Sequence, residues 1–220
     1  MALSLKDIAG RHEGETIWVI GTGPSLARVN LEAITGPRIC LNRVMFATKI
    51  IRNATYWMFV DDPWAKEVPG PWKEYLMNTF RGVGITAVMR KKLMTGKGFS
   101  KAPDGPNVVH FDYWNRNDAE KSGDIRTHDR QAVIDSNMLY CYTGTAAPAV
   151  HLAWVLGASK VKLVGIDGTD GHGPQVAHWY ATPMRGGFAY AKSRQEAIDT
   201  ASMLGMEVED LSTEQEDAIV

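Results

Sequence analysis

A glycine-rich stretch near the start of the chain has residues suited to holding an anion. It follows an apolar run and has the sequence VIGTGPSL, Val19 to Leu26. Gly21 and Gly23 carry no Cβ, so their backbone N–H groups could approach an anion closely. Ser25 could cap a following helix, whose amino terminus favours negative charge. A tight strand-to-helix turn is the plainer alternative. The residues expected along a phosphate are Gly21, Thr22, Gly23, Pro24 and Ser25.

The spacing of this stretch excludes two common phosphate loops. Leu26 stands where the dinucleotide pattern G-x-G-x-x-G needs its third glycine. The Walker pattern fails as well, because no Gly-Lys-Ser/Thr follows at the required distance. The prediction is therefore that backbone amides, and not a lysine, hold the phosphates of a nucleotide here.

Polar residues also follow three other predicted strands. Asn42 can both donate and accept hydrogen bonds, which suits a ribose or a base edge, although a turn residue is the simpler alternative. Asp61 and Asp62 could bind Mg²⁺ or a sugar hydroxyl, and they could equally cap the next helix. Asp167 ends a late strand and offers the same choice.

A second anion-friendly site is predicted before an apolar helix. Thr143, Gly144 and Thr145 precede a segment of small residues, and their hydroxyls would join the amino terminus of that helix. A plain helix cap accounts for these residues equally well.

The Gly/Pro-rich segment DGHGPQVAHWYATPMRGG carries the candidate catalytic residues. His172 or His178 could act as a general base, because the ordinary pKa of histidine lies near neutrality. Tyr180 could join them, and Arg185 is suited to clamp a phosphate.

Alternating strand and helix patterns must position these residues. Strands are predicted over 16–20, 38–42, 54–62, 84–89, 107–114, 160–167 and 206–212, and helices over 146–156 and 193–205. The stretch 25–35 has helix-like parts, the basic stretch 90–106 resembles a loop, and 115–131 is a polar surface segment. The alternation predicts an α/β layer fold with a mainly parallel sheet. Ligands bind beyond the carboxyl ends of such strands, so the polar residues above should share one edge.

Length and composition narrow the class of protein. The chain has 220 residues, 45% of them hydrophobic, which fits a single domain over 1–220, with a short lid-like loop near 168–190. A net charge of −1 excludes the global basic field of a dedicated nucleic-acid binder. Two cysteines are too few for a disulfide framework, and no secretory signal or membrane-spanning run is evident. A cytoplasmic location is expected.

Three segments together resemble two related families. VIGTGPSL, the Leu-Asn pair ending at Asn42, and TGTAAPAVHLAWVLGASKVKLVGID are similar to the small bacterial sialyltransferases. They are also similar to the MptE-like family, which contains archaeal 6-hydroxymethylpterin diphosphokinases. The likeness covers about half the chain, mainly residues 16–62 and 140–168.

The sialyltransferase resemblance implies a Rossmann-like three-layer fold, a GT-A-like variant, that binds a CMP-sugar. It implies that the glycine stretch lies along the nucleotide and phosphate, and that Asn42 contacts the donor. Residues 143–145 would line the donor pocket, with Asp167 near the ribose or cytosine. His172 or His178 would be the general base, with Tyr180 or Tyr190 helping the departing phosphate.

Two other functions stay open. The diphosphokinase resemblance implies transfer of a pyrophosphoryl group from ATP, with Mg²⁺ held by Asp61 and Asp62. The third hypothesis is a nucleotide-binding protein without catalysis. The leading hypothesis is a glycosyltransferase that uses a nucleotide-sugar donor. No cofactor is assigned to it, and Mg²⁺ is one option. Its acceptor would be a saccharide, a small molecule or a nucleic acid, and the sequence leaves its oligomeric state open.

Overall fold

The computed structural model describes residues 2–42, 44, 54–61, 84–95, 98–101, 104–115, 128–141, 144–167 and 190–212. Its strands are β1 (Thr16–Ile20), β2 (Arg38–Leu41), β3 (Tyr56–Asp61), β4 (Thr86–Thr95), β5 (Gly98–Lys101), β6 (Val108–Asn115), β7 (Met138–Cys141), β8 (Lys160–Val164) and β9 (Glu207–Asp210). The α-helices are α4 (Arg130–Ser136), α5 (Ala146–Val155) and α6 (Tyr190–Met203). Two short 3₁₀ helices are η1 (Leu5–Asp7) and η2 (Pro24–Arg28).

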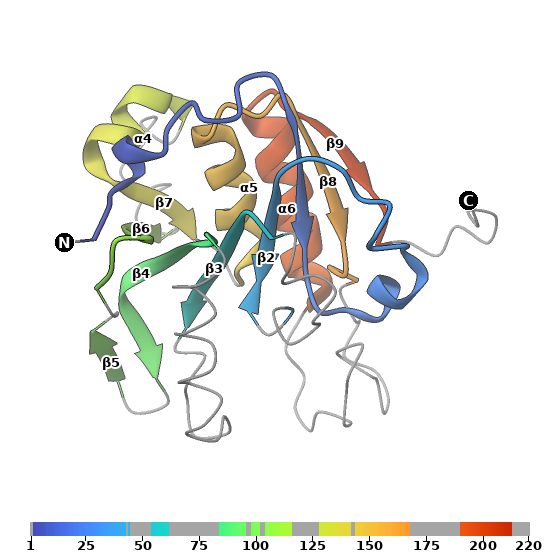
Figure 1. Ribbon diagram of the computed structural model, residues 1–220, viewed down its shortest axis with the longest axis horizontal. Helices are drawn as coiled ribbons and strands as arrows, with labels where there is room; N and C mark the ends of the chain where they lie inside the picture. The colour runs from blue at the N-terminus through green and yellow to red at the C-terminus, as the bar shows by residue number, and fades with distance from the viewer. Residues whose placement is uncertain are drawn as a thin grey trace.

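The strands form one sheet whose order fixes where a ligand would bind. Eight strands run parallel in the order β7-β6-β4-β3-β2-β1-β8-β9, and β5 pairs with β4 in the antiparallel sense (Figure 1). The chain builds outward from β1 to β7 and then returns to the other side of β1 with β8 and β9. The sheet therefore has its topological switch point between β1 and β8, and the α/β Rossmann-like fold expected from the sequence is confirmed.

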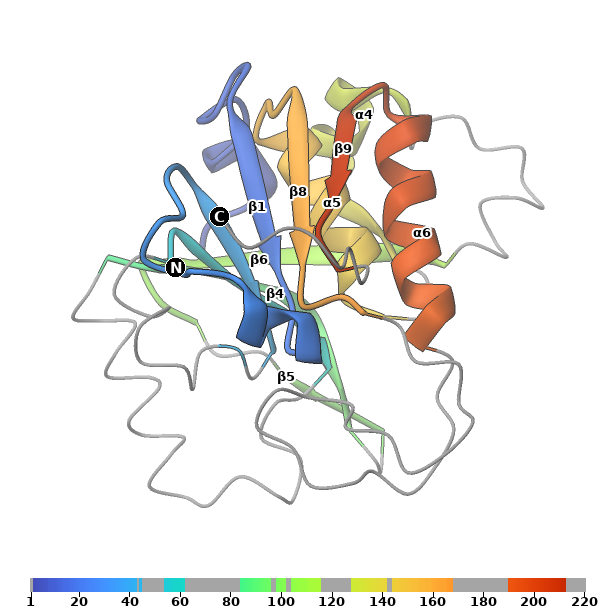
Figure 2. The ribbon, with the colours of Figure 1, turned by 90° about the vertical axis from the view of Figure 1, so that its right-hand side faces the viewer.

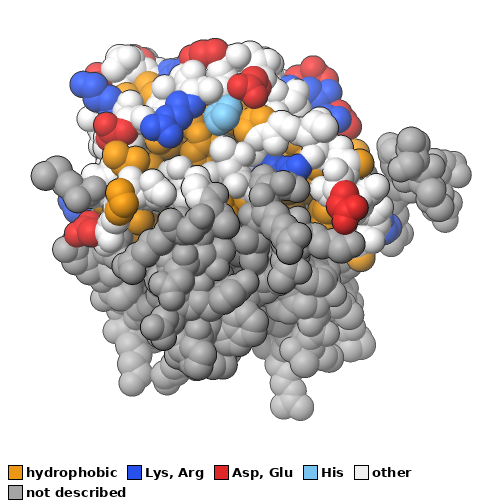
Figure 3. Space-filling model, in the orientation of Figure 1, with side chains coloured by type: hydrophobic (Ala, Val, Ile, Leu, Met, Phe, Trp, Pro, Cys, Tyr) orange, Lys and Arg blue, Asp and Glu red, His pale blue; other side chains and the backbone are white. Residues whose placement is uncertain are grey.

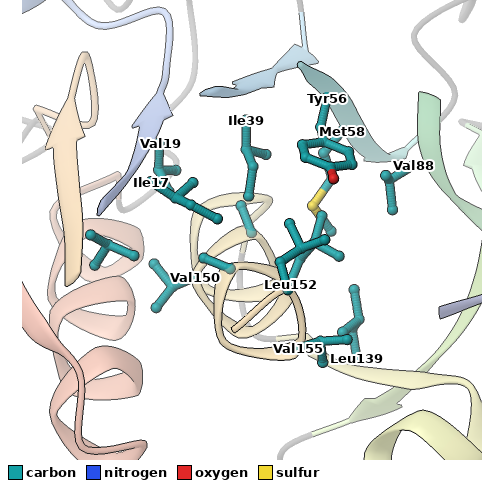
Figure 4. Packing of buried hydrophobic residues seen from close by; sticks show 14 of the residues in the cluster. Ile17, Val19, Ile39, Tyr56, Met58, Val88, Leu139, Val150, Leu152 and Val155 are labelled. Carbon is teal, nitrogen blue, oxygen red and sulfur yellow. The ribbon is translucent and has the colours of Figure 1, made fainter. Parts of the chain in front are cut away.

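Helix α5 forms the centre of the larger core. It is buried on nearly every side, Pro148 is tolerated in its first turn, and Gly157, at φ +99°, follows its end. Side chains from several strands of the sheet pack into the same cluster as α5, among them Val19, Ile39 and Met58 (Figure 4). A helix that is apolar all round must be enclosed, which explains why α5 packs under the sheet with α6 along its flank.

The opposite face of the sheet buries a second, smaller cluster. All three described α-helices lie on one side of the sheet, and η2 with the segment leading to β2 lies on the other (Figure 2). Leu26 and Ile34 from that segment pack with Trp57 and Phe59. Cys40 is fully buried in the same cluster, and burial raises the pKa of its thiol to about 12. The thiol therefore behaves as a small core side chain.

The structure corrects three of the local predictions. The basic stretch 90–106 is not simply a loop, because β4 continues through Thr95 and β5 pairs back onto it. The helix-like stretch 25–35 forms only η2 and turns. Strand β7 was not predicted, because its four residues follow α4 directly and only the neighbouring β6 gives them a partner. Strand pairing decided the first and the third case, because β5 pairs with β4 and β7 pairs with β6.

The described surface carries mixed charge. On the face in Figure 3, acidic and basic side chains alternate over the coloured part of the molecule. None of the helices within the described ranges is both long enough and apolar enough to cross a bilayer.

We expect Leu152→Ala to lower the free energy of unfolding by about 2–5 kcal/mol, because it opens a cavity under the sheet. Met203→Ala is the matched control, since that side chain is 36% exposed and should cost about 0.5 kcal/mol or less. Urea denaturation of both variants measures the difference. Equal costs would contradict the central place of α5.

Candidate functional site

The loops that follow β1 and β8 interlock at the switch point. The Gly21 amide donates to the Val164 carbonyl (2.8 Å), and the Gly23 amide donates to the Gly165 carbonyl (2.7 Å). A Cβ on Gly21 would overlap the Gly165 carbonyl, and a Cβ on Gly165 would overlap that of Gly21. Gly165 also has φ +69°, a conformation that glycine adopts without strain. The glycines therefore let two backbones touch.

Ser25 and Asp167 fasten the same loops together. The Gly165 amide donates to Ser25 Oγ (2.9 Å), and the Ser25 amide donates to Asp167 Oδ1 (2.9 Å). Asp167 Oδ2 is buried where a Cβ on Gly23 would overlap it, and it has no hydrogen-bond partner within the described part of the chain. Arg28 Nη2 lies 4.0 Å from Asp167 Oδ1. Ser25 and Asp167, both residues of the predicted site, are therefore bonded to each other.

These contacts change how the glycine stretch could act. The amides of Gly21, Gly23 and Ser25 all have acceptors within the protein, so in this structure they are not free to hold a phosphate. Ser25 does not cap a helix: the N-cap of η2 is Gly23, Pro24 is its first residue, and Ser25 Oγ accepts from Gly165 instead. A role for Thr22 and its neighbours in nucleotide binding stays a prediction.

Asn42 and Thr145 meet at the same edge of the sheet. Thr145 Oγ1 donates to Asn42 Oδ1 (3.3 Å), and Trp57 Nε1 donates to the Asn42 carbonyl (2.7 Å). Asn42 has φ +48°, which is uncommon for a residue with a side chain, and it is exposed. Thr145 is buried at the N-cap of α5 yet makes no side-chain cap bond. Thr145 is therefore the N-cap residue of α5 by position, but its hydroxyl is directed to Asn42 and not to the helix backbone.

Two further predicted residues belong to this edge. A Cβ on Gly144 would come 2.7 Å from Ser193 Oγ, so the loop before α5 lies against the first turns of α6. Asp61 ends β3, where its backbone pairs with Met94 of β4. Asp61 therefore lies at the carboxyl end of a parallel strand, as the sequence predicted, and Gly144 precedes α5, also as predicted.

Several predicted residues lie outside the described part of the chain. They are Asp62, Thr143, His172, His178, Tyr180 and Arg185, together with nearly all of the predicted lid-like loop near 168–190. Within the described ranges, no group of three or more His, Cys, Asp or Glu side chains is placed to hold a metal ion.

The structure adds contacts that the sequence gave no signal for. Trp57 was interpreted only as part of a strand, but its indole fixes the backbone of Asn42. At the opposite, amino-terminal edge, His12 lies between Glu15 (Nδ1 to Oε1, 3.2 Å) and Tyr56 (Nε2 to Oη, 3.0 Å). Burial raises the pKa of the Tyr56 hydroxyl. This contact ties the amino-terminal segment to β3.

The fold defines an α/β protein of the Rossmann-like class, a class in which ligands bind outside the carboxyl ends of the strands. No protein-family model and no curated protein matches the chain. Among solved structures, it is similar to the sialyltransferase CstII from Campylobacter jejuni in complex with a substrate analogue, cytidine-5'-monophosphate. That match has 12% identity and a TM-score of 0.49, and covers 90% of this chain and 80% of the other. A second match is sialyltransferase CST-II in complex with a trisaccharide acceptor and CMP, at 12% identity and a TM-score of 0.46, covering 90% and 81%.

Gly21→Ala should destabilise the protein by about 2 kcal/mol or more, because the new methyl group would overlap a backbone carbonyl that cannot turn aside. Gly105→Ala is the matched control, since its Cβ would meet only a Val108 methyl at 3.2 Å. Thermal unfolding of both variants provides the measurement. A Gly21→Ala protein as stable as the control would show that the loops need not touch.

Asp167→Ala should lower the free energy of unfolding by about 1–3 kcal/mol, because the Ser25 amide loses its acceptor. Asp167→Asn keeps an oxygen at the Oδ1 position and should retain most of that stability. Denaturant titration of the two variants separates them. If both lose stability equally, the negative charge of Asp167 matters more than the hydrogen bond.

Proposed function

We propose that the chain is a nucleotide-dependent glycosyltransferase that moves a sugar from a nucleotide-sugar donor to an acceptor hydroxyl. The observation that carries the proposal is the pairing of Asn42 with Thr145 at the carboxyl edge, beside the β1–β8 switch point. Open parallel sheets bind their ligands outside this edge. The sequence resemblance to the small sialyltransferases supports a donor in which the sugar is attached to a cytidine nucleotide.

Asn42 is the proposed contact to the nucleotide. Its Oδ1 accepts from Thr145, the side chain is exposed, and its Nδ2 amide has no hydrogen-bond partner among the described residues, so that it can donate to a ligand. An amide donor suits an oxygen acceptor such as a pyrimidine carbonyl or a ribose oxygen. The Trp57 bond to the Asn42 carbonyl holds the residue in its positive-φ conformation, so the amide is oriented before the ligand arrives.

The proposed chemistry uses the histidines predicted from the sequence. His172 or His178 takes the proton of the acceptor hydroxyl as that oxygen attacks the anomeric carbon. The bond from the anomeric carbon to the donor phosphate breaks, and the nucleotide leaves with the electron pair. Arg185 and Tyr180 stabilise the charge on its phosphate. These four assignments rest on residue type and on the family resemblance.

A Mg²⁺-dependent diphosphokinase is the second candidate. Asp61 ends β3 at the same edge of the sheet as Asn42, and with Asp62 it would supply the carboxylates that Mg²⁺ prefers. This proposal requires the metal for activity and ATP as the donor. A nucleotide-binding protein without catalysis would use the same site and would show no turnover.

A thermal-shift panel of CMP, CDP, UDP, GDP, ADP and ATP, each with and without Mg²⁺, tests these proposals. We expect CMP to raise the melting temperature without metal, because a ligand present at about 100 times its Kd adds about 2.7 kcal/mol to stability. Stabilisation only by ATP with Mg²⁺ would favour the diphosphokinase. No shift with any nucleotide would contradict nucleotide binding.

Asn42→Ala and Thr145→Val should each reduce the CMP shift, the first by removing the donor and the second by releasing Asn42 Oδ1. Asn107→Ala is the control, because Asn107 directly precedes β6 at the amino-terminal edge. Melting temperatures without ligand report the stability of each variant. Loss of the shift in the control as well would show that the effect is not local to the site.

A further inference from the structure

A phosphate bound at the switch point needs a positive charge that the glycine stretch does not supply. The amides of Gly21, Gly23 and Ser25 already donate to acceptors within the protein. Asp167 brings a carboxylate to the same place, and its Oδ2 atom is buried without a hydrogen-bond partner among the described residues. A phosphate here would meet a negative charge and none of these three amides, so a cationic side chain must offset the repulsion.

Arg28 is a cation that the fold fixes at this point. It is the last residue of η2, which Figure 2 shows in blue at the ends of β1 and β8. Leu26 is almost fully buried, Val29 packs against the smaller core cluster, and the Val29 amide donates to the Leu26 carbonyl (3.4 Å). Arg28 itself is exposed. Residues before and after Arg28 are therefore anchored, which fixes where its side chain begins.

The guanidinium of Arg28 lies near Asp167 and keeps its hydrogen-bond donors available. Its Nη2 atom is 4.0 Å from Asp167 Oδ1, beyond hydrogen-bond distance, and 50% of the side chain is exposed. Within the described part of the chain, this guanidinium donates no hydrogen bond. An arginine has five N–H donors in a planar fork that matches the oxygens of a phosphate. Arg28 can therefore stay beside Asp167 and still bind a phosphate.

Cations elsewhere along the edge are less well placed. Arg194 is paired with Asp210, with its Nη2 atom 2.6 Å from Oδ2. Arg90 and Lys91 are on β4, which is three strands from β1 in the sheet. Because neighbouring strands are about 4.8 Å apart, these two residues begin about 14 Å from β1. Of the described residues, only Arg28 has a cationic nitrogen within 4.0 Å of the carboxylate at the switch point.

We infer that Arg28 binds the phosphate of the nucleotide-sugar donor. The inference rests on the proposed glycosyltransferase function and names the residue that holds the leaving group. Asn42 follows β2 and Arg28 lies beside the loop after β8, so the two residues flank the end of β1. One nucleotide could then contact Asn42 with its base or ribose and Arg28 with its phosphate. When the bond to the sugar breaks, the phosphate oxygen keeps the electron pair, and the guanidinium stabilises that charge.

Calorimetric titrations with CMP and with cytidine test the inference, because the two ligands differ only by the phosphate. We expect the unmodified protein to bind CMP more tightly than cytidine. Arg28→Gln should weaken CMP binding about ten- to a hundredfold and leave cytidine binding unchanged, because it removes hydrogen bonds between charged groups. Arg28→Lys should lose less, since it keeps the charge without the planar fork.

Lys91→Gln is the matched control, because it removes one positive charge from an exposed side chain at the same edge. Its distance from β1 exceeds the Debye length of about 8 Å at about 150 mM salt, so both affinities should stay unchanged. Arg28→Gln should keep the melting temperature of the unmodified protein, because the side chain is half exposed and has no hydrogen bond within the described ranges.

The double variant Arg28→Gln/Asp167→Asn separates direct contact from relief of repulsion. If it recovers the unmodified preference for CMP over cytidine, Arg28 only offsets the carboxylate, and the inference is overturned. The inference also fails if Arg28→Gln keeps that preference, if it weakens cytidine binding equally, or if Lys91→Gln loses as much.

Two results with the unmodified protein keep this inference distinguishable from the proposed function. Equal affinities for CMP and cytidine would reject the phosphate contact of Arg28 and leave nucleoside binding at Asn42 in place. Binding of neither ligand would reject the proposed function and the inference together.

Discussion

The contact of two backbones at Gly21 and Gly165 is the constraint on which the edge of the sheet depends. Each glycine lies where a Cβ would overlap the carbonyl of the other, and the hydrogen bonds around them extend the β1–β8 pairing beyond the strands. Ser25 and Asp167 lock the two loops from the side. Main-chain contacts therefore occupy the sheet edge at the switch point. The groups that could contact a ligand lie on the neighbouring elements instead.

Packing in the two cores positions the residues of these neighbouring elements. Helix α5 can lie under β1 and β2 because most of its side chains are apolar and several are alanines, and Thr145 at its amino terminus consequently reaches the end of β2. Trp57, buried on the other face of the sheet, fixes Asn42 from the opposite direction. Packing on both faces thus orients one exposed amide, as a preorganised binding group requires.

Charge is distributed unevenly along this edge. The interlocked loops bring a carboxylate, Asp167, to the β1–β8 side, whereas β4 leaves the sheet at Arg90–Leu93 on the other side.

The sequence by itself determined the α/β class, most strands, the helices α5 and α6, and the edge to which Asn42 and Asp167 belong. Apolar periodicity and strand-end residues are local patterns, so they can be recognised from the sequence alone. Only the tertiary structure decided what the glycines do, that Ser25 binds Gly165, and that the basic stretch joins a hairpin. A glycine that admits a phosphate and one that admits another backbone look alike in sequence, because both lack a Cβ and the difference is the partner that the fold supplies.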